Sequence, residues 1–191
     1  MPINQLPNLI SVARMLLVIP VVWALLNQEY SLALVLFAVA GISDAVDGFL
    51  AKHYSWQSRL GSILDPLADK LLLVSSYLAL AWVGLIPVWL VAAVLLRDLL
   101  IVAGAVLLHF WMGRYEMSPS LVSKLNTVFQ IVLVLAVVLY HGAYAFNPWI
   151  VQMLIYIVLA TTLVSGLNYV WVWGGRALST RKRQQEQKRA H

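Results

Sequence analysis

Two pairs of aspartates interrupt strongly hydrophobic sequence, Asp44 with Asp47 and Asp65 with Asp69. The chain has eight acidic residues, so half of them lie in this one region. An ionised carboxylate at the centre of a bilayer costs about 3 kcal/mol or more, and acids in apolar helices therefore usually mark a functional site. Four converging carboxylates would repel one another unless positive charge lay between them, and a pair of divalent cations would supply that charge.

Helical spacing predicts that these acids converge. Asp44 and Asp47 are three residues apart, whereas Asp65 and Asp69 are four apart, so each pair shares one face of a helix. Because the two helices are antiparallel neighbours, both pairs are expected at the same depth. Three small residues beside the acids leave room for a bulky ligand or for close helix approach: Gly48, Ala51 and Gly61.

The residue types indicate which metal such a site would hold. The chain has no cysteine, and no histidine occurs at these spacings, so zinc is disfavoured. Mg²⁺ or Mn²⁺ suits a site of carboxylate and water ligands. Two such divalent ions a few ångströms apart form the usual clamp for displacement at phosphorus.

Basic residues accompany the acids. Arg14, Lys70 and Arg97 also lie in apolar sequence, and their presence beside buried acids favours a polar cavity. Arg14, Lys52 and Arg59 would add positive charge for phosphate oxygens. The alternative is a buried network of ion pairs without a ligand, but four acids on two matched faces exceed what such pairing requires.

Composition predicts the elements that position these residues. The 191-residue chain is 62% hydrophobic and 11% charged, with a mean hydropathy of +0.84, as in a multi-span membrane protein. Each span needs about 20 helical residues. We expect an all-α integral membrane protein with six transmembrane helices at about 8–27, 31–52, 60–84, 86–110, 120–141 and 148–172.

Basic residues also predict the orientation. Most of them fall in alternate loops and the C-terminal segment, so the positive-inside rule places both termini in the cytoplasm. We expect a membrane domain over 1–175 and a basic cytoplasmic tail over 176–191, a topology signal that ends in disorder and is attracted to anionic lipids. The chain begins without a basic leader, so we expect the first apolar segment to be retained as a span.

The spacing of these residues resembles a known signature. Asp44-x-x-Asp47-Gly48-x-x-Ala51-Lys52, followed after eight residues by Gly61-x-x-x-Asp65-x-x-x-Asp69, is similar to that of the CDP-alcohol phosphatidyltransferases. The resemblance implies a homodimer of six-helix subunits with a two-metal site that faces the cytosol. It also implies transfer of a phosphatidyl group from CDP-diacylglycerol to an alcohol, with release of CMP.

The same resemblance assigns roles to individual residues. Asp44, Asp47 and Asp65 look like metal ligands, and Asp69 looks like both a ligand and the general base. Gly48 and Gly61, by the same resemblance, would give the cytidine nucleotide close access. The chain departs from the family in having Lys52 where arginine is usual, which keeps the charge but loses the bidentate fork.

The acceptor alcohol is the least determined feature. Arg97-Asp98 and the stretch from Ser123 to Thr127 look more like the mitochondrial-type, CMP-forming cardiolipin synthases, which use phosphatidylglycerol. The alternative is a phosphatidylglycerophosphate synthase, whose acceptor is glycerol 3-phosphate. Arg14, Arg97 and Lys124 could contact the acceptor phosphate in either case. Arg97 could equally orient helices, and Lys124 could be only a topology signal.

A cation transporter is the hypothesis from a different functional class, because buried acids also form ion paths. Transporters often contain internal repeats and broken helices, and neither is evident in this sequence. A non-catalytic scaffold would not explain the buried carboxylates. We therefore expect a membrane enzyme, located in the bacterial inner membrane or its equivalent, with lipid substrates and no nucleic-acid partner.

Overall fold

The computed structural model describes residues 6–53, 61–112, 121–144 and 146–189. Over these ranges the chain is all-helical, as predicted, and contains no strand. The six helices are α1 (Leu6–Leu26), α2 (Tyr30–His53), α3 (Gly61–Trp82), α4 (Val88–Met112), α5 (Leu121–Gly142) and α6 (Trp149–Arg189).

Short turns between the helices contain the residues expected to end them. Gly84 lies between α3 and α4 with a φ of 79°, a conformation that glycine adopts without steric cost. Before α6, the side chain of Asn147 accepts a hydrogen bond from the backbone N–H of Trp149 and caps the helix. By contrast, α3 continues through Pro66 without ending there.

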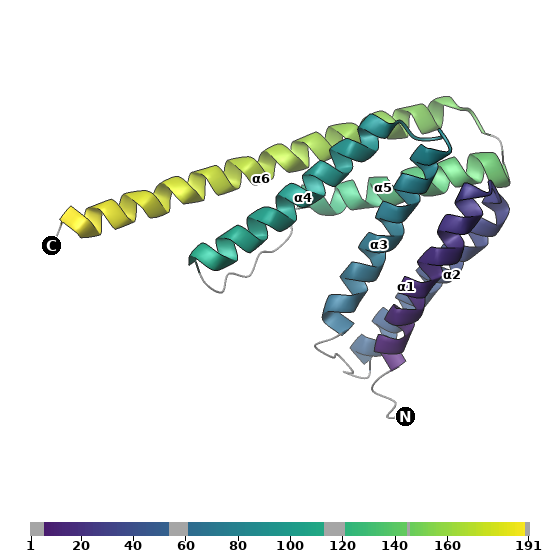
Figure 1. The fold of residues 1–191 in the computed structure, drawn as a ribbon, viewed down its shortest axis with the longest axis horizontal. Helices are drawn as coiled ribbons and strands as arrows, with labels where there is room; N and C mark the ends of the chain where they lie inside the picture. The colour runs from purple at the N-terminus through teal and green to yellow at the C-terminus, as the bar shows by residue number, and fades with distance from the viewer. Residues whose placement is uncertain (1–5, 54–60, 113–120, 145, 190–191) are drawn as a thin grey trace.

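The helices form two sets that are steeply inclined to each other (Figure 1). In the first set, α1 contacts both α2 and α3, and in the second, α6 contacts both α4 and α5. Contacts of α5 with α2 and α3, and of α4 with α3, join the two sets. The helices come together near the three short turns and diverge away from them (Figure 1).

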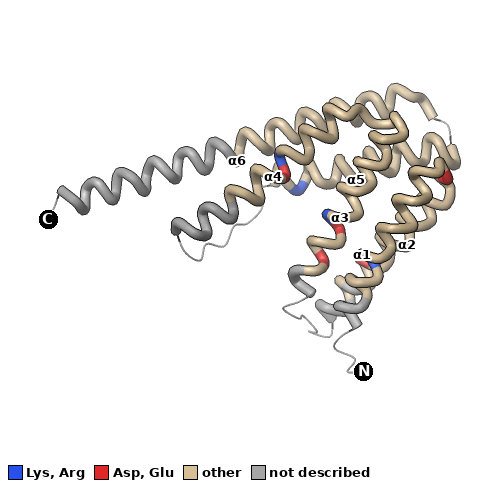
Figure 2. Tube along the Cα trace, viewed as in Figure 1, with Lys and Arg blue, Asp and Glu red and all other residues tan. Residues whose placement is uncertain are grey.

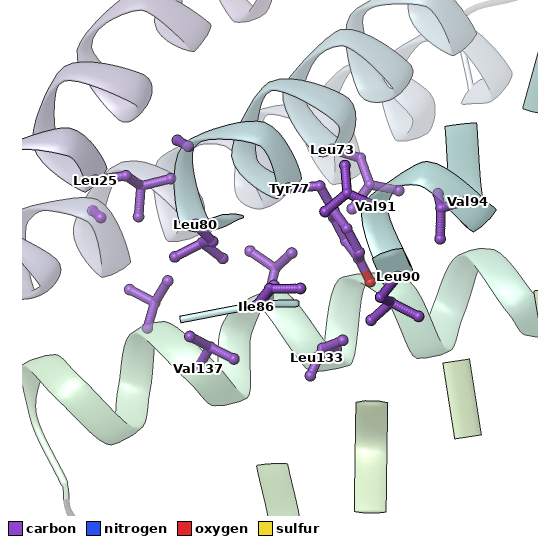
Figure 3. Packing of buried hydrophobic residues seen from close by; sticks show 14 of the residues in the cluster. Leu25, Leu73, Tyr77, Leu80, Ile86, Leu90, Val91, Val94, Leu133 and Val137 are labelled. Carbon is purple, nitrogen blue, oxygen red and sulfur yellow. The ribbon is translucent and has the colours of Figure 1, made fainter. Parts of the chain in front are cut away.

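An apolar core holds the two sets together (Figure 3). Leu25 of α1, Leu80 of α3 and Val137 of α5 belong to this buried cluster. Tyr77 extends from α3, and its hydroxyl donates a hydrogen bond to the backbone carbonyl of Gln130 on α5, at 3.3 Å. This packing fixes α1 and α3, the helices that carry much of the candidate site, relative to α5.

Large apolar side chains also cover the outer surface. Trp82 is 85% exposed, Leu121 77% and Trp149 70%. A surface of this kind is typical of contact with lipid. Within the described residues, 121–142 and 149–169 are long and apolar enough to span a bilayer, each with a mean hydropathy of 2.1. These features are consistent with an integral membrane protein.

The sixth helix differs from the expectation. We predicted a span over 148–172 followed by a basic tail that ends in disorder, whereas α6 continues as one helix to Arg189. The segment after Gly175 is rich in arginine, lysine, glutamine and glutamate, which have high helix propensity, and it contains no proline. The basic segment is therefore helical in the structure.

Candidate active site

Charged residues on α1, α3 and α4 lie away from the short turns, in the region where the helices diverge (Figure 2). Arg14 of α1 connects two of the predicted acids there. One terminal guanidinium nitrogen of Arg14 lies 2.7 Å from Oδ1 of Asp44 and 2.7 Å from Oδ1 of Asp69. Arg14 is only 2% exposed, whereas the two aspartate side chains are about half exposed. Two carboxylates from different helices thus converge on one positive atom.

A second residue of α1 holds another predicted acid. The hydroxyl of Ser11 donates a hydrogen bond to Oδ1 of Asp65 on α3. Ser11 is fully buried and lies three residues before Arg14, so the two residues share the face of α1 that meets α3. Helix α1 therefore orients two of the acids of α3.

A separate network of charged residues extends from α3 to α6. Nζ of Lys70 lies 2.6 Å from one carboxylate oxygen of Asp98, and Nη1 of Arg97 lies 2.9 Å from the other. Nε and Nη2 of Arg97 donate to the hydroxyl of Ser165 at 3.1 and 2.6 Å, and Nη2 also donates to Ser123. Arg97 is 5% exposed, so its charge is almost completely removed from solvent.

A cavity of about 440 Å³ lies between α1, α2, α3 and α5. Five polar side chains line it: Arg14, Asp44, Asp69, Lys70 and Thr127. Most of the other lining residues are apolar, and a few charged groups in apolar walls are typical of a small-molecule site. The volume is within the usual range of about 300–1,000 Å³ for such sites.

An apolar groove of about 710 Å³ between α2 and α5 adjoins the cavity. Phe37, Gly41 and Leu135 line both spaces, so the two lie side by side. The groove is otherwise lined by Leu34, Ala38, Ile42, Val132, Ala136 and Leu139. A molecule with a charged head and an apolar chain would match this combination of spaces.

The structure brings three of the predicted site residues to the cavity, namely Arg14, Asp44 and Asp69. Asp65 contacts Ser11 instead, and Arg97 contacts Asp98, Ser123 and Ser165; neither Asp65 nor Arg97 lines the cavity. Ion pairs of the kind considered as an alternative to a ligand site are present, and those of Arg14 with Asp44 and Asp69 lie at the wall of the cavity.

Other predicted residues lie farther from the cavity or outside the described part of the chain. Lys124 is exposed on α5, and Gly48 is exposed with open space where a Cβ would lie. Arg59 and the side chains of four further predicted residues lie outside the described residues: Asp47, Ala51, Lys52 and Gly61.

Sequence reasoning missed two residues that the structure brings to this region. Ser11 lies one helical turn before Arg14, a spacing that would have placed it beside the acids of α3. Lys70 directly follows Asp69 and lines the same cavity; from sequence it counts among the cations that favour a polar cavity, but it is given no binding role.

The donor chemistry of the site fits a hard divalent cation. Carboxylate oxygens are the ligands that Mg²⁺ and Mn²⁺ prefer, and Asp44 and Asp69 already converge on one positive centre. Among the side chains that the structure describes, no three acidic or histidine groups gather closely enough to complete a metal site. Asp47, whose side chain is outside this set, lies one helical turn after Asp44.

Comparison with known proteins identifies the family of this chain. The family model for CDP-alcohol phosphatidyltransferase matches residues 4–174. The chain is 35% identical over 147 residues to a protein of Rattus norvegicus named cardiolipin synthase (CMP-forming). This match covers 69% of this chain and 49% of the rat protein. It is 31% identical over 188 residues to a probable cardiolipin synthase (CMP-forming) of Drosophila melanogaster, and the match covers 88% of this chain and 57% of the Drosophila protein.

A relative with another name is equally similar. The chain is 36% identical over 184 residues to the chloroplastic CDP-diacylglycerol–glycerol-3-phosphate 3-phosphatidyltransferase 1 of Oryza sativa subsp. japonica, covering 86% of this chain and 56% of the rice protein. The chain spans about half the length of these curated relatives. Because the family model covers nearly all of its helical region, including every aspartate of the site, the chain belongs to the CDP-alcohol phosphatidyltransferase family.

Proposed function

We propose that this chain transfers a phosphatidyl group from CDP-diacylglycerol to the hydroxyl of phosphatidylglycerol, giving cardiolipin and CMP. The observation that carries the proposal is the convergence of Asp44 and Asp69, from two helices, on one positive atom at the wall of a cavity. The two carboxylates outnumber the single cation, so this group attracts the divalent cations that phosphate transfer needs. Membership of the family supports the reaction class.

Asp69 acts as the general base. Its side chain lines the cavity and is 56% exposed, so an acceptor hydroxyl has access to it. Asp69 takes the proton of this hydroxyl, and the oxygen forms a bond to the phosphorus that carries diacylglycerol. The bond from that phosphorus to the CMP oxygen breaks, and CMP leaves with the bonding electrons.

The acids Asp44, Asp47, Asp65 and Asp69 would also hold two divalent ions, Mg²⁺ or Mn²⁺. When bound, such ions stabilise the negative charge that develops on the phosphate oxygens. Arg14 holds Asp44 and Asp69 toward each other, and the hydrogen bond from Ser11 fixes one oxygen of Asp65. Helix α1 thus orients three of the four acids.

The proposed topology has six spans with both termini in the cytoplasm and the active site facing the cytosol. The alternation of loops with and without basic residues supports this orientation. By family resemblance, the protein is a homodimer of the inner membrane or its equivalent. The remaining substrate-binding residues stay predictions from sequence: Gly48, Ala51, Lys52, Arg59, Gly61 and Lys124. The burial and hydrogen bonds of Arg97 instead favour a role in orienting helices.

The apolar groove favours a lipid acceptor. Phosphatidylglycerol has two acyl chains, and its site must be open to apolar surroundings, as the groove between α2 and α5 is. Glycerol 3-phosphate would need only a compact cationic pocket. The groove would also suit the acyl chains of CDP-diacylglycerol, and the rice relative is named for glycerol 3-phosphate. Phosphatidylglycerophosphate synthesis is therefore the second candidate.

The test supplies purified protein with CDP-diacylglycerol and, in parallel, phosphatidylglycerol, glycerol 3-phosphate, inositol or serine. We expect CMP release and a product with four acyl chains only with phosphatidylglycerol, and only when Mg²⁺ or Mn²⁺ is present. The Asp69→Asn protein is the matched control for contaminating activity. A phosphatidylglycerophosphate product would support the second candidate. Full activity in excess chelator would contradict the metal mechanism.

A further inference from the structure

The cavity has an acidic side. Arg14 contributes one positive charge, and its two described carboxylate partners, Asp44 and Asp69, contribute two negative charges. Because Arg14 is buried between them, its charge is used in holding the acids. This side of the cavity therefore attracts cations and leaves little of the Arg14 charge for a substrate anion.

The opposite balance occurs in the network around Lys70. Asp98 is one negative charge that is shared by two cations, Lys70 at 2.6 Å and Arg97 at 2.9 Å. The network thus has an excess of one positive charge. Arg97 is buried, and Ser165 and Ser123 accept further hydrogen bonds from it, so its guanidinium is fixed inside the protein.

Lys70 is the member of this network that a ligand can reach. Its side chain is 39% exposed, compared with 11% for Asp98 and 6% for Arg97. Lys70 lines the cavity, whereas Asp98 and Arg97 do not. The ammonium group carries three donors, and the contact with Asp98 leaves donors available for an anion.

We propose that Lys70 binds a phosphate group of a lipid substrate in the cavity and that Asp98 is the positioning residue that holds its ammonium there. The proposal rests on the proposed function and adds to it a phosphate-binding residue that lies outside the aspartate signature. Lys70 directly follows Asp69 on α3, so a phosphate bound by Lys70 lies beside the proposed general base. Arg97 supports the arrangement by neutralising and orienting Asp98 from the protein interior.

The kinetic test varies each lipid substrate separately while the other is saturating. A hydrogen bond to a charged group is worth about 1.5–3 kcal/mol, so Lys70→Ala should raise KM for one substrate about 10- to 100-fold. Its kcat should change much less. Lys70→Arg should restore most of the affinity. A higher KM for phosphatidylglycerol alone would show that Lys70 binds the phosphate of the acceptor. A higher KM for CDP-diacylglycerol alone would show that it binds a phosphate of the donor. Unchanged KM values for both substrates would overturn the proposal.

A double-mutant cycle tests the role of Asp98. If Asp98 acts through Lys70, Asp98→Asn should raise KM for the same substrate, and adding it to Lys70→Ala should cause no further rise. Additive effects would overturn the positioning role. Should Asp98→Asn fail to fold, because Arg97 would lose its buried partner, Lys70→Ala and Lys70→Arg still decide the phosphate contact.

A binding measurement separates this proposal from the proposed function. In detergent micelles, phosphatidylglycerol or CDP-diacylglycerol should raise Tm of the wild type more than diacylglycerol, which has no phosphate. Lys70→Ala should lose this difference, whereas Glu29→Gln, at an exposed turn, should keep it. Retention of the full difference in Lys70→Ala would overturn the proposal even if the protein had no transferase activity. Absence of transferase activity in the wild-type protein would instead contradict the proposed function and leave the phosphate-binding proposal standing.

Discussion

The guanidinium of Arg14 on α1 and the carboxylate of Asp69 on α3 lie 2.7 Å apart, although 55 positions separate them in the sequence. The proposed general base is therefore oriented by a helix that lies outside the aspartate signature. Since Arg14 also contacts Asp44 on α2, this one buried side chain sets the relative placement of three helices at the site.

Arg14→Ala should destabilise the protein because it leaves two carboxylates facing each other without their buried cation. Removing one partner of a buried pair costs about 3–5 kcal/mol, and we expect the lower part of this range because both aspartates are half exposed. Thermal unfolding in detergent measures the loss. Arg14→Lys is the matched control and should be less destabilised, because it keeps one positive charge.

Divalent ions should partly replace the charge that Arg14→Ala removes. If Asp44 and Asp69 are metal ligands, Mg²⁺ or Mn²⁺ should raise Tm of Arg14→Ala more than Tm of the wild type. The comparison uses the same proteins in chelator and in millimolar metal. Equal stabilisation of both proteins would argue against these two acids as ligands.

Spacing within single helices predicts which acids share a face, but the expectation that α2 and α3 are direct neighbours was wrong: in the described part of the chain they make no contact, and α1 packs against both. Residues three or four apart share a face. Asp44 and Asp69 come together across helices because both contact the same nitrogen of Arg14. The contact with Arg14 was harder to specify, because a helical period does not determine how α1 is rotated between α2 and α3. The same reason explains why Ser11 was missed, although its spacing from Arg14 contained the signal.

The pairing of Lys70 with Asp98 shows a second limit of prediction from sequence. Both residues lie in apolar sequence and were open to several partners before the crossing of α3 and α4 was known. Likewise, the sequence of Arg97 and its neighbours is compatible with either an acceptor contact or a role in orienting helices. Its hydrogen bonds to Ser123 and Ser165 and its near-complete burial now favour the second role.

Replacing each aspartate by asparagine should impair turnover at one position and metal binding at the others. Asp69→Asn should lower turnover by about 10²–10⁴-fold, the usual contribution of general-base catalysis, while largely preserving binding of metal and CDP-diacylglycerol. Asp44→Asn and Asp65→Asn should instead weaken metal binding, since each removes a charged ligand. Calorimetry with Mn²⁺ and with CDP-diacylglycerol checks the assignment. Loss of CDP-diacylglycerol binding only in Asp69→Asn would reverse it.

Gly142→Ala should destabilise the contact between the end of α5 and the start of α2. A Cβ at Gly142 would lie 2.8 Å from backbone and side-chain carbons of Tyr30, so the helices would have to separate. Separation would also weaken the hydrogen bond from Ser31 to the carbonyl of Gly142, now 2.8 Å long. We expect a loss of about 1–3 kcal/mol, as in other overpacked sites.

Gly41→Ala is the stability control for Gly142→Ala, because a Cβ at Gly41 meets no atom within 4 Å. Alanine in the interior of a helix is favoured over glycine by about 0.5–1 kcal/mol, so this variant should be neutral or slightly stabilised. Thermal unfolding of both variants provides the comparison. Equal destabilisation of the two would mean that the steric contact with Tyr30 is not the cause.

Filling the groove between α2 and α5 should impair the use of long-chain lipids. Ala136 lines the groove, and Ala136→Trp would place a large side chain where we expect an acyl chain. Val35 lies on α2, is 59% exposed and is absent from the lining, so Val35→Trp is the control for a tryptophan added to the lipid-facing surface. Both proteins should retain their fold, because neither position belongs to the buried core.

Chain length then distinguishes steric exclusion from general damage to the enzyme. The bilayer interior is as apolar as the groove, so an acyl chain displaced by tryptophan moves into lipid and not into water. The displaced chain loses its specific contacts in the groove but no hydrophobic free energy. Ala136→Trp should therefore raise KM for substrates with long acyl chains several-fold and affect dioctanoyl substrates less. Running the comparison once with phosphatidylglycerol and once with CDP-diacylglycerol identifies which lipid occupies the groove. If KM changed equally for short and long chains, or if Val35→Trp had the same effect, the groove would not be an acyl-chain site, and the main structural support for a lipid acceptor over glycerol 3-phosphate would be lost.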